Sequence, residues 1–145
     1  MSVDSQSYFI DSNIWLYRFI VNPNDLNSIK KQQIAIEITS KDNLFISTQV
    51  INEVCFNLIK KAKFNDFQID NLIKEFNLGC EILSLDFLTV EYAVKLRKNY
   101  CLSFWDSLIV ASAILGNVNI IYSEDMQNNL IIENKVTIIN PFNYS

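Results

Sequence analysis

The chain has 145 residues, half of them hydrophobic, and carries 16 acidic against 12 basic residues for a net charge of −4. It contains no histidine, which excludes Ser-His-Asp and Cys-His catalysis, histidine-based acid–base chemistry and most catalytic zinc sites. Hydrolytic chemistry would therefore have to use carboxylates, hydroxyls, lysines or a hard metal ion. The negative charge also argues against tight nonspecific binding of nucleic acid by bulk electrostatics.

The length fits one domain, which we expect to span residues 1–145. Its longest apolar runs are too short to cross a bilayer. The N-terminus MSVDSQS carries Asp4 and has no basic segment followed by an apolar one, so it does not have the pattern of a signal peptide. Cys55, Cys80 and Cys101 are far apart and odd in number, which favours free thiols in a reducing cytoplasm.

In chain order, the apolar triplet at 8–10 predicts a first buried strand, and 11–13 predict a turn and cap that open a short helix ending at residue 20. After a break at 22–25, a helix is predicted at 28–40 and a second strand at 44–46. Ser47 or Thr48 can cap a helix at 49–62, on which Gln49, Glu53 and Asn57 fall on one polar stripe. Another helix is predicted at 66–77.

In the second half, the pattern predicts a third strand at 81–85 and a helix at 87–99 with Leu88 and Val94 among its inward residues. Ser103 caps a helix at 104–115 that is apolar nearly all round and therefore central. Strands at 120–122 and 137–139 follow. This alternation is typical of an α/β protein, and we expect a three-layer α/β/α fold with a central, mainly parallel sheet of about five strands.

Four acidic residues stand where such a sheet binds ligands, beyond the carboxyl ends of its strands. Asp11 follows the first strand, Asp125 follows the strand at 120–122, and Glu53 and Asp106 lie in the first turns of helices. Asp106 is the only charged residue in the run CLSFWDSLIVASAILGNVNIIYS. Crowded carboxylates repel one another, so their convergence implies a divalent cation, and oxygen ligands favour Mg²⁺ or Mn²⁺. Taken alone, Asp11, Glu53 and Asp125 are more often helix caps, solvated helix positions or loop residues, whereas Asp106 is the hardest to explain in this way because Ser103 already occupies the cap position.

The residues around these carboxylates resemble the signature of PIN-domain ribonucleases, in particular the VapC-like toxins of bacterial toxin–antitoxin pairs. The resemblance rests on IDSN at 10–13, on Glu53 after STQ, on SFWDSLIVASA at 103–113 and on YSEDM at 122–126. It covers nearly the whole chain in order and spacing.

The resemblance implies a PIN-like nuclease domain that hydrolyses RNA phosphodiester bonds with Mg²⁺ or Mn²⁺ as its cofactor. Its catalytic residues would be Asp11, Glu53, Asp106 and Asp125. Of these, Asp11 and Asp106 would bind the metal directly, and Glu53 and Asp125 would bind it directly or through water. Three further polar residues would orient the ligands or a water molecule: Asn13, Ser123 and Glu124.

The same resemblance implies partners: an RNA substrate, a cognate protein antitoxin that blocks the cleft, and a second copy of the chain in a homodimer. Two basic clusters, Lys60 to Lys63 and Lys95 to Lys98, could contact RNA or be solvated helix ends. Arg18 could face the cleft or the solvent. Trp15 and Trp105 are expected in the core or in an interface.

Two other interpretations stay open. Phosphoryl transfer through an aspartyl nucleophile, as in haloacid-dehalogenase-type phosphatases or response-regulator receivers, could use Asp11 or Asp86 after a strand. The phosphatase pattern, however, needs a second Asp where Asn13 stands, and a receiver needs an acidic pair where Ser12 follows Asp11. A noncatalytic binding module that keeps the acidic pocket would carry the same sequence pattern.

Overall fold

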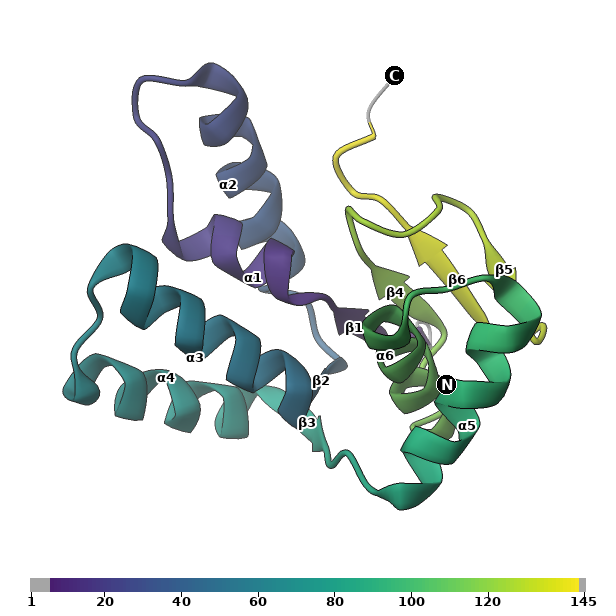
Figure 1. Ribbon diagram of the computed structural model, residues 1–145. Helices are drawn as coiled ribbons and strands as arrows, with labels where there is room; N and C mark the ends of the chain where they lie inside the picture. The colour runs from purple at the N-terminus through teal and green to yellow at the C-terminus, as the bar shows by residue number, and fades with distance from the viewer. Residues whose placement is uncertain (1–5, 144–145) are drawn as a thin grey trace, which may run out of the picture.

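The computed structural model describes residues 6–143, in which helices and strands alternate along the chain (Figure 1). Residues 1–5, which carry most of the segment on which the signal-peptide prediction depends, lie outside this described part. Between residues 6 and 143, no helix combines the length and the apolar character that crossing a membrane requires.

The strands are β1 (Tyr8–Ile10), β2 (Leu44–Ser47), β3 (Cys80–Leu83), β4 (Ile120–Tyr122), β5 (Ile131–Ile132) and β6 (Val136–Ile139). The helices are α1 (Ser12–Phe19), α2 (Leu26–Ile38), α3 (Thr48–Ala62), α4 (Asp66–Gly79), α5 (Phe87–Tyr100) and α6 (Phe104–Leu115). All of the predicted helices and strands are present, with small shifts at their ends. Helix α2, for example, begins earlier than predicted because Asp25 caps it by accepting a hydrogen bond from the Asn27 N–H.

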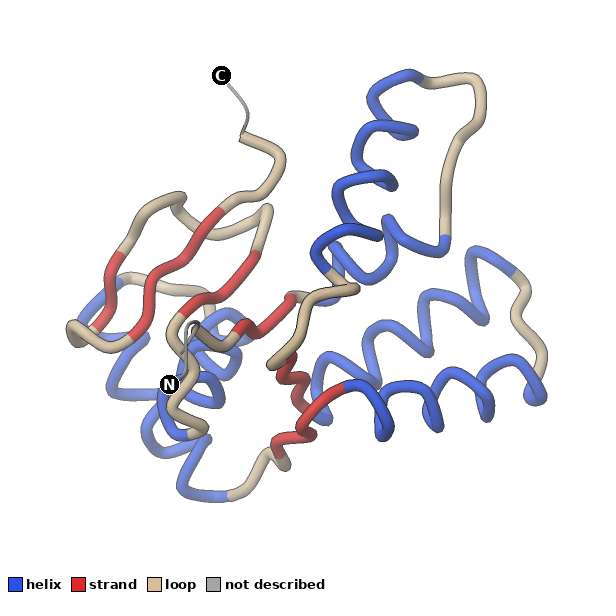
Figure 2. Tube along the Cα trace, turned by 180° about the vertical axis from the view of Figure 1, so that it is seen from behind, coloured by secondary structure: helices blue, strands red, loops and turns tan. Residues whose placement is uncertain are grey.

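The strands form one sheet in the order β3-β2-β1-β4-β6-β5, which Figure 2 shows as a continuous row. All neighbours are parallel except β5, which runs antiparallel to β6. The prediction of about five strands is therefore low by one, because a two-residue strand is too short to produce a periodic pattern. In the centre, Ile10 of β1 lies beside Tyr122 of β4, so the carboxyl ends of these strands meet at one edge.

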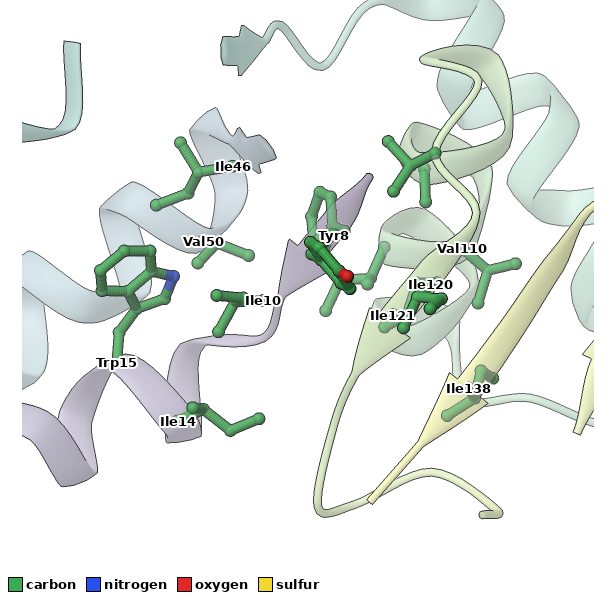
Figure 3. Close-up of a cluster of buried hydrophobic side chains, with 14 of the residues drawn as sticks. Tyr8, Ile10, Ile14, Trp15, Ile46, Val50, Val110, Ile120, Ile121 and Ile138 are labelled. Atoms are coloured by element: carbon green, nitrogen blue, oxygen red, sulfur yellow. The ribbon is translucent and has the colours of Figure 1, made fainter. Parts of the chain in front are cut away.

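Helices cover both faces of the sheet, which confirms the three-layer architecture (Figure 1). Helices α5 and α6 pack against each other on one face, and α1 packs against α2 and α3 on the other. Figure 3 shows Trp15 of α1 and Val50 of α3 gathered with Ile10 on one side of β1, while Val110 of α6 lies on the other side. Successive residues of a strand point to opposite faces of the sheet, so even a three-residue strand such as β1 contacts the helices on both faces.

Helix α6 is the central helix that the sequence predicts. Its residues are buried from Ser107 to Ile114. The inward face predicted for α5 is wrong in part, because Leu88 and Val94 are more than half exposed, while Thr89, Ala93 and Leu96 face the core. Two apolar rows lie side by side on this helix, and periodicity does not decide which row is buried.

The three cysteines are free thiols, as the sequence predicts. Cys55 and Cys80 are half-buried and Cys101 is exposed. Burial raises the pKa of the Cys80 thiol to about 11, which keeps it protonated and unreactive near neutral pH. Burial also raises the pKa of the Cys55 thiol, so neither half-buried cysteine has the depressed pKa of a catalytic thiol.

Candidate active site

Asp11 directly follows β1 and caps α1 at the carboxyl edge of the sheet. Its backbone N–H donates to the carbonyl of Tyr122 at 3.0 Å, which places Asp11 beside the end of β4. Its carboxylate accepts hydrogen bonds from the Ser12 N–H at 2.7 Å and from the Ser123 hydroxyl at 2.9 Å, and only 4% of the residue is exposed. Asp11 is thus fixed in a dry position by neutral donors.

Asp106 lies in the first turn of α6, at an end of that helix that reaches solvent. Its backbone N–H donates to the Ser103 hydroxyl at 3.1 Å, so Ser103 is the helix cap, as predicted. The side chain of Asp106 is consequently not needed as a cap. The buried remainder of α6 holds this half-buried carboxylate in place.

Glu53 lies in the second turn of α3, which begins where β2 ends. Ser47 caps this helix, and one carboxylate oxygen of Glu53, Oε1, is buried with no hydrogen-bond partner. A buried polar oxygen without a donor is destabilising unless a cation or a ligand meets it. The position of Glu53 is therefore better explained by a bound group than by folding.

Asp125 lies in the loop after β4 and is the most exposed of the four acidic residues. Its backbone N–H donates to the Ser123 hydroxyl, and its carboxylate accepts a hydrogen bond from the Asn13 side chain. Ser123 therefore connects the backbone of Asp125 to the carboxylate of Asp11, because the same hydroxyl donates to Asp11. Asn13 and Ser123 both hold acidic residues in place.

The four carboxylates act on one another through their charges. Burial raises the pKa of Asp11 to about 6, although Ser123 and Ser12 oppose this shift, and Asp106 and Asp125 add to it. Burial also raises the pKa of Glu53 to about 6, with repulsion from Asp11 and Asp106 adding to the shift. The pKa of Asp125 is raised by burial, then by nearby acidic groups that include Asp106. The folded chain therefore concentrates negative charge where several strands end.

These carboxylates have the chemistry of a hard-metal site. Among residues 6–143, no three acidic or cysteine side chains are gathered tightly enough to hold a metal ion as they stand. The donor set nevertheless fits Mg²⁺ or Mn²⁺, because Asp11 and Asp106 offer only oxygen and Glu53 has an unpartnered buried oxygen. A cation would offset the mutual repulsion that raises the carboxyl pKa values.

Glu124 is next to Asp125 in sequence but has a different environment. Its carboxylate accepts a hydrogen bond from the Tyr17 hydroxyl at 2.6 Å and pairs with the Lys31 ammonium at 2.5 Å. Lys31 also lies over the rings of Tyr17 and Phe142, 4.9 Å and 5.3 Å from their centroids. Glu124 thereby joins α1, α2 and the loop after β4.

Arg18 does not lie among the carboxylates. Its guanidinium donates to the Thr39 hydroxyl at 2.8 Å. It lines a cavity of about 310 Å³ together with the segment before β2 and the start of β3. That cavity is at the amino edge of the strands, opposite the candidate site, and the sequence alone did not decide between these locations.

The two basic clusters are exposed on helix ends. Lys60 and Lys61 lie in the last turn of α3, whereas Glu53 lies near its beginning. Lys95 and Lys98 lie toward the end of α5, which leads into the loop before Asp106. Contact of either cluster with RNA stays a prediction.

Two residues beside the carboxylates were not predicted as site residues, Gln49 and Trp105. Trp15 is buried in the core, as expected, but Trp105 is 63% exposed. The Gln49 amide donates to the Trp105 carbonyl at 3.3 Å, which joins the start of α3 to the start of α6. The position of Gln49 four residues before Glu53 is the sequence signal that could have identified it.

Asp86 is a helix cap. Its Oδ1 accepts hydrogen bonds from the N–H and the hydroxyl of Thr89 at the start of α5. These bonds hold the pKa of Asp86 below its usual value. This use of the side chain gives no support to Asp86 as a phosphoryl-accepting nucleophile.

Comparison with known proteins gives a family and a fold. The sequence matches the PIN domain family over residues 8–129. No curated protein matches the chain in sequence. The fold is similar to a toxin–antitoxin complex from Klebsiella pneumoniae, with a TM-score of 0.65 and 20% identity over 93% of this chain and 98% of that one.

Two other solved structures share the fold. VapC20 of Mycobacterium tuberculosis, a sarcin–ricin loop cleaving toxin, has a TM-score of 0.64 and 17% identity over 82% of this chain and 90% of that one. VapBC2 of Rickettsia felis, bound to a DNA fragment from its promoter, has a TM-score of 0.60 and 18% identity over 93% of this chain and 100% of that one. With the family match over most of its length, the chain belongs to the PIN domain family.

Proposed function

We propose that the protein is a metal-dependent endoribonuclease that hydrolyses RNA phosphodiester bonds and serves as the toxin of a toxin–antitoxin pair. The observation that carries the proposal is that Asp11, Glu53 and Asp106 lie near enough at the carboxyl edge of the sheet for their charges to act on one another. An acidic site without histidine suits hydrolysis by water beside a hard cation, because such an ion activates water and stabilises charge on the phosphodiester.

We propose a role for each residue of the site. Asp11 and Asp106 would hold Mg²⁺ or Mn²⁺ directly, with Glu53 and Asp125 as direct or water-mediated ligands. Ser123 fixes Asp11 through its hydroxyl, and that hydroxyl also accepts from the Asp125 N–H. A fixed ligand does not have to reorganise when charge develops on the substrate, which is how a rigid site lowers a barrier.

Asn13 and Glu124 support the same site from its border. The Asn13 amide restrains the exposed Asp125 carboxylate, which would otherwise move with its loop. Glu124 attaches the loop after β4 to α1 and α2 through Tyr17 and Lys31. We propose that both orient the acidic residues or a water molecule.

Partners follow from the toxin assignment. We propose that a cognate protein antitoxin blocks the acidic cleft with a basic or aromatic anchor, since such an anchor complements the charge of the site. The similarity of the fold to the Klebsiella toxin–antitoxin complex and to VapBC2 supports this partner. We further propose one nuclease domain over residues 1–145 that acts in the cytoplasm as a homodimer.

The decisive experiment compares wild type with Asp106→Asn. RNA ends are sequenced after induction in cells, and cleavage of the same RNA is measured with purified protein in Mg²⁺, Mn²⁺ or EDTA. We expect Asp106→Asn to lower the rate by about a thousandfold, the effect of losing several kcal/mol of transition-state stabilisation. The matched control is Asp70→Asn, because Asp70 is an exposed carboxylate on α4 that pairs only with Lys74 among the ion pairs observed.

Full activity in EDTA would contradict the proposal, as would unchanged cleavage by Asp106→Asn. Calorimetry with Mn²⁺ separates the remaining interpretations. A folded protein that binds no Mn²⁺ and cleaves no RNA would be the noncatalytic binding module. Labelling of Asp11 by beryllofluoride would favour phosphoryl transfer instead.

A further inference from the structure

A hollow of about 420 Å³ lies beside the candidate active site, between the first turns of α3 and the start of α6. It is lined by Thr48, Gln49, Asn52, Glu53, Leu85 and Trp105. Glu53 belongs to both the hollow and the acidic site, and Trp105 directly precedes Asp106. Whatever occupies the hollow is therefore next to the carboxylates.

One wall of the hollow is an accessible aromatic ring. Trp105 is 63% exposed, although most of α6 is buried. Its indole meets the ring of Phe104 edge to face, with centroids 5.5 Å apart and planes at 72°. Phe104 is itself 39% exposed. The pair is held in place by its own contact, yet it leaves a large aromatic surface for a ligand to stack on.

A second wall carries a buried acceptor with no donor. Gln49 is 8% exposed, and its Nε2 donates to the Trp105 carbonyl at 3.3 Å. Since only the amide nitrogen can donate to a carbonyl, this bond fixes which end of the amide is which. The other end, Oε1, is buried and has no hydrogen-bond partner. Because Gln49 lines the hollow, a ligand bound there lies beside the residue that carries this acceptor.

The charges of the lining exclude an anionic occupant. No lysine or arginine lines the hollow, and Glu53 contributes a carboxylate whose Oε1 is also buried without a partner. The buried unpartnered polar atoms of the wall are thus acceptors. A neutral, flat group that brings N–H donors fits these features, and a phosphate does not.

We propose that the hollow binds an unpaired nucleobase of the RNA substrate, which stacks on Trp105 and donates an N–H of its edge to Gln49 Oε1. The inference rests on the proposed ribonuclease function. Because Trp105 and Asp106 are consecutive, the bound base belongs to a nucleotide flanking the cleaved bond. The acceptor wall favours bases with an exocyclic amino group, such as adenine and cytosine, over uracil, whose edge presents carbonyl oxygens on both sides of its N–H.

The test uses RNA binding, which does not depend on turnover. Asp106→Asn protein is titrated with fluorescein-labelled heptamers of adenosine, of uridine and of N6,N6-dimethyladenosine, and polarisation gives the Kd. We expect the adenosine heptamer to bind best. Adding Trp105→Ala should raise its Kd about tenfold or more, the effect of losing one stacked base. Adding Gln49→Leu should raise the Kd of the adenosine heptamer several-fold and leave that of the dimethyl heptamer unchanged.

Two matched variants control for general effects. Phe67→Ala removes another exposed aromatic ring, on α4, and Gln33→Leu removes another glutamine, exposed on α2. Both should leave every Kd unchanged. Should Trp105→Ala fail to fold, Trp105→Phe keeps a stacking ring and should retain binding. Quenching of Trp105 fluorescence by unlabelled adenosine heptamer reports stacking without substituting the ring at all.

Equal Kd values with and without Trp105→Ala, or no preference between the adenosine and dimethyl heptamers, would overturn the inference. A wild-type protein that cleaves RNA with a KM insensitive to Trp105→Ala would also overturn it while leaving the ribonuclease proposal intact. A wild-type protein that cleaves no RNA would defeat the ribonuclease proposal, and the heptamer titrations would still decide on the base site.

Discussion

Asp11 and Glu124 both lie at the carboxyl edge of the sheet, but the environments of their carboxylates are opposite. Glu124 has its own cation and hydroxyl, because Lys31 and Tyr17 reach it from α2 and α1. Asp11 is the more buried of the two, yet it accepts hydrogen bonds from the neutral Ser12 N–H and Ser123 hydroxyl, and Asp106 and Asp125 add negative charge beside it.

The difference separates a structural acid from one that we propose to be functional. The pairing with Glu124 raises the pKa of Lys31, which means that the ion pair stabilises the charged state of the Lys31 ammonium. Burial raises the pKa of Asp11 to about 6, which means that its charged state destabilises the fold. A sequence under selection for stability alone would not retain such a group, so the cost is best explained by a ligand.

The largest effect that would sharpen this contrast is the response to metal. At a Mn²⁺ concentration about 100 times the Kd, binding to the folded state should stabilise wild type by about 2.7 kcal/mol. That corresponds to a rise in Tm on the order of 10 °C for a chain of this size. Asp11→Asn should lose this rise, and Glu124→Gln should keep it.

Differential scanning fluorimetry with Mn²⁺ or Mg²⁺ measures the effect, and Ca²⁺-free EDTA buffer gives the baseline. Asp70→Asn serves as the control for loss of an exposed charge. If Glu124→Gln lost the rise as completely as Asp11→Asn, then Glu124 would be a ligand and the distinction between the two carboxylates would be wrong.

The next effect is the pH dependence of stability without metal. The pKa of Asp11 is raised from 3.8 to about 6 in the folded state, so the folded chain binds more protons than the unfolded one between these values. Stability is therefore fully present below pH 3.8 and is lost as the pH rises through 6. Asp11→Asn removes this loss and should stabilise the metal-free protein by about 2 kcal/mol at pH 8, with little gain at pH 4.

Urea unfolding in EDTA at pH 4, 6 and 8 gives these free energies. Glu53 has a pKa of about 6 as well, so the variant should keep a weaker pH dependence of the same sign. A wild type that becomes more stable from pH 4 to 8, or an Asp11→Asn variant that is less stable than wild type at pH 8, would show that Asp11 is not a destabilising charge.

Much of the acidic site could be predicted because it depends on simple rules of chain geometry. Asp11 and Asp125 follow strands, and the carboxyl ends of parallel neighbours share an edge. Asp106 stood out as the one charge in an apolar helix, and Ser103 could be recognised as the cap that leaves it free. These are local features that one sequence displays.

The rest depends on contacts between distant segments. Lys31 meets Glu124 across 93 residues, and Gln49 meets Trp105 across 56. Neither pair leaves a periodic or local signal. The large aromatic side chain of Trp105 suggests burial when the sequence is considered alone. Its exposure follows only from its place in the first turn of α6.

The smallest effect concerns the structural acid itself. Glu124→Gln keeps the shape of the side chain but replaces the ion pair with Lys31 by a neutral hydrogen bond. Both side chains are only about one-fifth exposed, so the loss should be larger than at the surface, and we expect the free energy of unfolding to fall by about 1 to 1.5 kcal/mol at pH 7. Lys31→Met should cost a similar amount, and the double variant less than the sum, because each single variant leaves the other group unpaired.

The exposed pair of Asp70 and Lys74 on α4 gives the comparison for this cycle, since their side chains are 62% and 69% exposed. Asp70→Asn should change stability by less than about 0.5 kcal/mol. The double-mutant cycle of Glu124 with Lys31 can be compared with that of Asp70 with Lys74. If the first coupling energy were no larger than the second, the ion pair with Lys31 would not explain the position of Glu124. Its carboxylate would then need the same explanation as that of Asp11, a ligand supplied from outside the chain. At pH 8, Glu124→Gln should lower the free energy of unfolding and Asp11→Asn should raise it. These opposite signs distinguish a carboxylate that stabilises the fold from one that destabilises it and that we propose is retained for chemistry.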